Sequence, residues 1–174
     1  MSSSVSGRGA YARWAVLLLT MVLAACYPRY NWRELPVADG LAVLAFPARP
    51  DVAQREIVLA GLKVNFVLTS AKVDDSLFSF GYAQLPPESG PPARQSARQA
   101  LIDSLAKGMG QEAPSSAQEG TVFKLVSARG ESPLVVFARV VLHHDVVMRV
   151  VASGPPEELT DEIASEFMRS LVLR

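Results

Sequence analysis

Short apolar segments separated by turn residues fill most of residues 41–153, and this pattern predicts a sheet of antiparallel strands. Along residues 77–85 large and small side chains alternate, so Phe78, Phe80 and Tyr82 share one face. The other short apolar segments are also interpreted as strands. The expected strands are residues 41–46, 55–60, 63–73, 77–85, 121–128, 134–142 and 145–153.

The last two strands of this series form a hairpin that is apolar on both faces. A two-residue turn at residues 143–144 pairs Leu142 with Asp145. A sheet that is open to water on one side shows polar alternation, so both sides of this hairpin are expected to be covered. Arg139 and Arg149 interrupt the apolar pattern, and each is expected to lay its stem over apolar surface and reach solvent with its charged head.

Two segments have the four-residue period of an amphipathic helix. The first is residues 93–109, and the second opens at residues 154–158, where Pro and Glu suit the first helical turn. Phe167 lies in the core-facing stripe of the second. Together these patterns predict an α+β domain, an antiparallel β-sheet of about six to seven strands covered by helices on both faces.

Residues 1–25 have the layout of a secretory signal peptide. Arg8 and Arg13 are its charged residues, and residues 14–25 form an apolar run of twelve. A membrane-spanning helix needs about 20 apolar residues, whereas a signal core needs about 7–15. The length therefore favours a signal over a transmembrane segment.

The end of this run, Leu23-Ala24-Ala25-Cys26, resembles the lipobox of bacterial lipoprotein precursors. That resemblance implies that Cys26 is the lipid attachment site and the first residue of the mature protein. The other interpretation is an ordinary signal or a buried N-terminal helix with an incidental Cys. Tyr27 follows the Cys where an Asp resembles an inner-membrane retention signal, so the outer membrane is favoured over the inner.

The composition and charge of the chain without its signal peptide exclude some classes of function. The full chain has 17 basic and 17 acidic residues. Removing residues 1–25 removes two Arg, which leaves 15 basic residues against 17 acidic and a net charge of −2. A nucleic-acid-binding domain shows a basic surplus, so no nucleic-acid partner is expected. The single Cys excludes an internal disulfide.

Residues 26–40 are expected to be a short membrane-proximal tether, followed by one domain over residues 41–174. Tyr30 and Trp32 have two interpretations. Their rings can sit in the lipid interface, or Trp32 can pack on the edge of the domain, which is the favoured interpretation.

The mature chain resembles the PsbP-like family, an α/β/α sandwich that also occurs in bacterial lipoproteins. The residues that carry the resemblance are FPARP at 46–50, GYAQLP at 81–86 and EFMRSLVL at 166–173. They are structural motifs spread over residues 30–174. The family is characterised by binding and assembly roles without shared catalytic residues, so the resemblance implies no site residue.

Searches for catalytic, metal and cofactor motifs lead to no such site. His143, His144 and Asp145 cluster, but adjacent His on an extended chain point apart, and a zinc site needs three or four ligands. We interpret them as an exposed polar turn. Asp74 and Asp75 are interpreted as turn residues rather than paired catalytic carboxylates. No cofactor and no enzymatic activity are expected.

The sequence thus predicts a lipoprotein anchored to the bilayer through Cys26 and facing the periplasm. Its expected role is non-catalytic binding or envelope assembly, with an envelope protein as partner. The alternative is a carrier of a small apolar ligand in a pocket between sheet and helix, with an internal cavity under the face that bears Phe78 and Tyr82.

Overall fold

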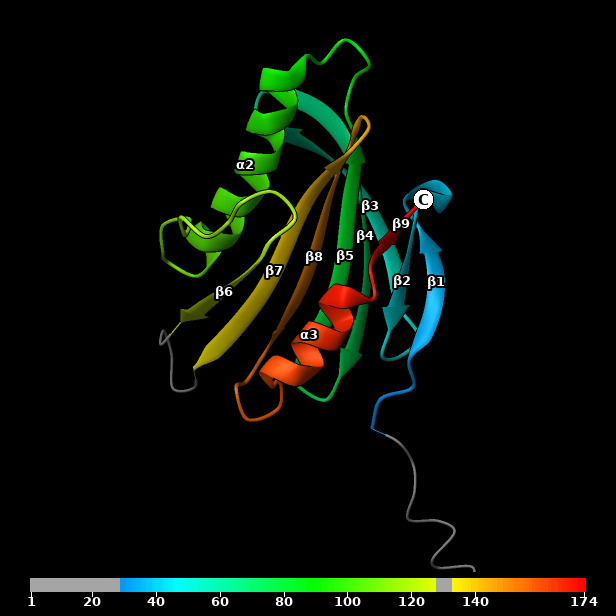
Figure 1. The fold of residues 1–174 in the computed structure, drawn as a ribbon, viewed down its shortest axis with the longest axis vertical. Coiled ribbons are helices and arrows are strands. Elements are labelled where there is room, and N and C mark those ends of the chain that lie inside the picture. The colour runs from blue at the N-terminus through cyan, green and yellow to red at the C-terminus, as the bar shows by residue number, and fades with distance from the viewer. Residues whose placement is uncertain (1–28, 128–132) are drawn as a thin grey trace, which may run out of the picture.

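The computed structural model describes residues 29–127 and 133–174, and Figure 1 shows their arrangement. Strands make up 48% of it and helices 21%. The strands are β1 (Arg33–Val37), β2 (Ala42–Phe46), β3 (Asp51–Leu59), β4 (Leu62–Val73), β5 (Ser76–Gln84), β6 (Val122–Ser127), β7 (Leu134–His143), β8 (Val146–Gly154) and β9 (Val172–Leu173). The helices are the 3₁₀ turn η1 (Ala38–Gly40), α2 (Pro91–Gly108) and α3 (Asp161–Arg169).

The strands form two antiparallel sheets rather than one. The larger sheet has six strands in the order β3-β4-β5-β8-β7-β6, and the smaller has three in the order β1-β2-β9 (Figure 1). The expected single sheet covered by helices on both faces, an α/β/α sandwich, is wrong. A nine-residue helix such as α3 is about 13 Å long, too short to cover a six-stranded sheet, and the small sheet lies beside it on that face.

A separate apolar cluster forms on each face of the six-stranded sheet. On one face Leu101 and Ile102 of α2 pack with side chains of β4, β7 and β8. On the other face Phe167 of α3 packs with Phe46 of the small sheet and Phe78 of β5. Both faces of the β7–β8 hairpin are therefore buried, as the sequence predicted.

The register of that hairpin differs from the prediction by two residues. Leu142 pairs with Val147 rather than Asp145, and His143 still belongs to the ladder, paired with Val146. The turn is therefore His144-Asp145, with His144 at a φ of 53°. A shift of one residue would turn every side chain to the other face, but a shift of two preserves the faces. The two apolar faces were consequently assigned correctly from the wrong register.

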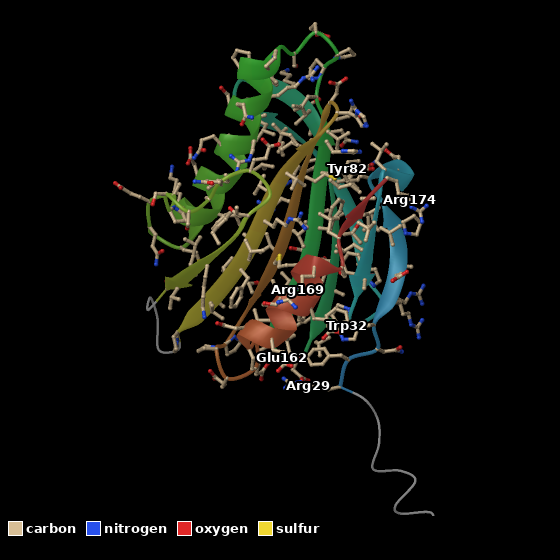
Figure 2. All side chains as sticks on the ribbon, in the orientation of Figure 1. Arg29, Trp32, Tyr82, Glu162, Arg169 and Arg174 are labelled. Atoms are coloured by element: carbon tan, nitrogen blue, oxygen red, sulfur yellow. The ribbon has the colours of Figure 1, made fainter. Side chains whose placement is uncertain are left out.

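The lead-in expected to act as a tether is part of the folded body from Arg29 onward. β1 pairs with β2 over its whole length. Trp32 stacks on Tyr30, lies edge-on to Phe78 and packs beside Phe167, so the interpretation that Trp32 packs on the domain is confirmed. In Figure 2 Arg29 and Trp32 lie at the same end of the molecule as Glu162 of α3.

The last helix begins later than the sequence suggested. Residues 155–160 form a loop, and α3 starts after Thr160, whose hydroxyl accepts a hydrogen bond from the Ile163 amide at 3.3 Å. Thr160 is thus the N-cap, a position that favours Ser, Thr, Asp or Asn. Phe167 is fully buried, as predicted.

Candidate functional site

A pocket of about 190 Å³ opens on the α2 face of the six-stranded sheet. Its lining comes from strands only, namely β3, β4 and β8, and it does not lie between sheet and helix. The lining residues are Ala53, Gln54, Arg55, Phe66, Leu68 and Arg149. None of them is acidic, and none is a nucleophile or an imidazole.

Cross-strand pairing explains how residues far apart in sequence meet here. Ala53 pairs with Leu68, Leu68 with Gly81, and Gly81 with Arg149, so the four form one row across β3, β4, β5 and β8. Directly paired residues of antiparallel strands point to the same face. The row therefore alternates small and large residues, and it leaves a hollow where Gly81 has no side chain.

Phe66 fills part of that hollow. A Cβ at position 81 would lie 2.7 Å from Cε1 of Phe66 and closer still to Cζ, which no real Cβ tolerates. The ring is itself almost fully buried. The ring can therefore take this position, and the pocket this shape, only because residue 81 has no side chain.

Arg149 lies over this ring. Its guanidinium carbon is 5.4 Å from the centroid of Phe66, within the range of a cation–π contact. Its Nε is buried and has no hydrogen-bond partner among the described residues. Burial lowers the pKa of Arg149 below its ordinary value, and the positive charge of Arg55 lowers it further. Among the described residues no ion pair compensates Arg149.

This arrangement suits an anionic group. A guanidinium presents a planar fork of donors that matches a carboxylate, and Arg55 adds a second positive charge at the same pocket. Phe66 and Leu68 supply apolar walls. The volume is below the roughly 300–1,000 Å³ typical of small-molecule sites, so the pocket fits a group the size of one side chain.

The sequence did not show that the Nε of Arg149 is buried without a hydrogen-bond partner. Both Arg139 and Arg149 were expected to lay their stems over apolar surface and reach solvent with their heads, and both are partly exposed. Arg139 donates from Nε to the carbonyl of Gly120 at 2.9 Å and from Nη1 to that of Met168 at 3.3 Å. Arg149 has no such acceptor for Nε. An Arg in the middle of an apolar face was the available signal, but the sequence could not show which of the two lacks partners.

The pocket is also not where a ligand cavity was expected. Phe78 and Phe80 are fully buried in the cluster on the other face, where Tyr30, Trp32, Phe46 and Phe167 surround Phe78. Tyr82 is partly buried, and its hydroxyl donates to Asp39 at 3.1 Å. Burial raises the pKa of Tyr82, and this hydrogen bond raises it further. The aromatic stripe is therefore core.

In the His143-His144-Asp145 segment, His143 ends β7 and His144-Asp145 form the turn, and both His143 and Asp145 have polar partners. Asp145 forms an ion pair with Arg94 at 2.5 Å. Nε2 of His143 lies 2.9 Å from the backbone oxygen of Arg174. Within residues 29–127 and 133–174, no group of three or more His, Cys, Asp or Glu is placed to hold a metal ion.

Asp74 and Asp75 lie in the β4–β5 turn, as expected, and they pair with different cations. Asp74 accepts from Nε of Arg29 at 2.8 Å, and Asp75 lies 3.7 Å from Nζ of Lys72. Arg29 also reaches Glu158 at 3.5 Å. The two ion pairs of Arg29 attach the start of the described chain to the domain. Cys26, the proposed lipid attachment site, lies outside the described residues.

Comparisons of the chain with models of protein families, with curated proteins and with solved structures find no match. The resemblance of residues 30–174 to PsbP-like proteins therefore stays a prediction about ancestry. In the part of the chain that the structure describes, no helix combines the length and the apolar character needed to cross a membrane.

Proposed function

We propose that the protein is a lipid-anchored envelope protein with a non-catalytic binding role, and that it binds an anionic group of a protein partner in the Arg149 pocket. The observation that carries the proposal is Arg149 itself, a partly buried cation whose Nε is buried without a hydrogen-bond partner, and which faces an open pocket without a compensating carboxylate among the described residues. An uncompensated buried charge costs stability, so a protein keeps one chiefly where a ligand completes it.

Anchorage is the second part of the proposal. The lipobox-like sequence ends at Cys26, and Arg29 is already packed on the domain through Asp74 and Glu158. Three residue steps of 3.8 Å separate the Cα atoms of Cys26 and Arg29, at most about 11 Å. Acylation of Cys26 would hold the β4–β5 turn close to the bilayer, on the periplasmic side and preferably at the outer membrane.

The carrier of a small apolar ligand is less well supported. The pocket is smaller than most small-molecule sites, and two of its six lining residues are cations.

The test is an NMR titration of the lipidated, ¹⁵N-labelled protein in detergent micelles with N-acetylglutamate amide as the probe. We expect the Nε–H signal of Arg149 to shift saturably with this probe and to stay unmoved with the uncharged N-acetylglutamine amide. Arg55→Gln, which removes the second cation of the pocket, should weaken the response, whereas Arg169→Gln, an exposed Arg on the other face, should leave it unchanged. Equal shifts with both probes, or no shift, would contradict the proposal.

Stability separates a binding role from a packing role for Arg149. Arg149→Met removes an uncompensated cation and keeps an apolar stem, so the free energy of unfolding should stay equal or rise. A role limited to covering Phe66 predicts a fall. A less stable Arg149→Met protein would therefore count against the proposed site.

A further inference from the structure

β3 forms one edge of the six-stranded sheet. It pairs with β4 on one side, and no other strand of the described residues follows it in the sheet. Seven of its nine residues, Asp51 to Glu56 and Val58, are exposed. No backbone hydrogen bond of the described residues involves β3 outside its ladder with β4. Its outer backbone groups are therefore open to another strand.

The side chains of this edge are unusual for a strand that only faces water. Val52 is 68% exposed and Val58 is 67% exposed, and both lie on the face opposite the pocket. Between them stand Arg55, on the pocket face, and Glu56, on the other. Long edge strands with exposed apolar residues are templates for pairing, and charged residues decide which strand can pair.

A second copy of this chain does not fit the edge in the symmetric register that matches the exposed valines. In an antiparallel pair related by a two-fold axis, the register that places Val52 opposite Val58 also places Arg55 opposite Arg55 of the other copy. Like charges directly opposite each other destabilise a strand pair. The next register, shifted by one residue in each copy, places Glu56 opposite Glu56.

We propose that an extended segment of a different protein adds to the sheet as an antiparallel strand along β3, with an acidic residue opposite Arg55. This rests on the proposed function, since the acidic residue stands on the pocket face beside Ala53 and Phe66. Strand addition gains affinity from main-chain hydrogen bonds and specificity from alternate side chains. Every pairing of both sheets is antiparallel, which is also the more stable pairing.

The register defines the partner sequence. Apolar residues stand opposite Val58 and Val52, a basic residue opposite Glu56 and an acidic residue opposite Arg55. Read along the partner chain, the pattern is apolar, any, basic, acidic, any, any, apolar. Each opposite-charge pair across the strands strengthens binding by about two- to fivefold.

The experiment selects a displayed library of random twelve-residue peptides on the lipidated full-length protein in detergent micelles. The expected result is enrichment of this pattern, with affinity lost when alternate amides of a selected peptide are N-methylated. The Arg55→Glu protein should bind the selected peptide more weakly. It should bind a version of that peptide in which Lys replaces the acidic residue. The Nε–H signal of Arg149 with N-acetylglutamate amide serves as the separate readout of the pocket.

The outcomes are distinguishable. Amide exchange should slow at alternate residues of β3 when the peptide binds, and Lys124→Ala on the opposite edge strand should change nothing. N-methylated peptides that bind as well as the parent, protection absent from β3, or no enriched pattern would each overturn strand addition. The Arg149 response to the small carboxylate would persist in each of those cases if the pocket alone is the site.

Discussion

The aromatic ring of Phe66, on β4, occupies the space above Gly81 of β5 that a side chain would take. The guanidinium of Arg149 lies over the same ring. The pocket is thus shaped by a residue with no side chain, and this relationship leads to a direct test.

Gly81→Ala should displace the ring of Phe66 into the pocket. Overpacking a filled interior costs about 1–3 kcal/mol, and the displaced ring should also weaken the Arg149 response to N-acetylglutamate amide. Urea unfolding and the NMR titration measure the two effects. Gly108→Ala is the control, because no atom lies within 4 Å of a Cβ there and no strain follows. Equal behaviour of the two variants would refute the role of Gly81.

Phe167→Ala should be among the most destabilising single changes. The ring is fully buried between Trp32, Phe46 and Phe78, where truncation leaves a cavity. The expected cost is about 3–5 kcal/mol in urea unfolding. Val172→Ala, at a residue 57% exposed, should change stability by less than about 0.5 kcal/mol. An unchanged unfolding curve for Phe167→Ala would remove this ring from the core.

Thr160→Ala should destabilise the protein by about 0.5–2 kcal/mol, because it removes the acceptor for the Ile163 amide at the start of α3. Thr160→Ser keeps a hydroxyl and should recover most of the loss. Thermal unfolding of the three proteins measures both effects. If Ala and Ser variants melt together, the cap contributes nothing.

Stability should fall at alkaline pH in a way that depends on Tyr82. Its pKa is raised in the folded protein, so the folded state favours the neutral phenol. That contribution is complete below the unfolded pKa of about 10 and is lost as the pH rises through the folded value. Tyr82→Phe should flatten the dependence of the urea midpoint between about pH 9 and pH 12. Parallel curves for the two proteins would rule out this role of Tyr82. Burial also raises the pKa of Tyr30, which accounts for any pH dependence that remains in the Tyr82→Phe protein.

Cys26→Ser should yield an unlipidated precursor that keeps residues 1–25. Mass spectrometry of the intact protein and detergent phase partitioning report processing and lipidation directly. Tyr27→Phe, one residue away, should be processed like the wild type. Normal processing and partitioning of Cys26→Ser would exclude the lipoprotein.

The sequence by itself determined which residues share a face in β5 and in the β7–β8 hairpin. Phe78 and Phe80 were placed together correctly, and so were both apolar faces of the β7–β8 hairpin, because the period of a strand is local and survives a shift of two residues. The helix that became α2 was found for the same reason. Strand pairing is not local, and the one pairing that the sequence predicted, that of β7 with β8, was placed in the wrong register.

Only the tertiary structure decided that β1 and β9 join β2 in a second sheet, since two short segments at opposite ends of the chain carry no pattern of their own. It also decided the site. Phe66, Gly81 and Arg149 come from three strands, and they meet because the registers of β4, β5 and β8 align them in neighbouring rows. Whether Arg149 finds an acceptor depends on every element packed around it, which is a property of the fold and not of the residues beside it in the chain.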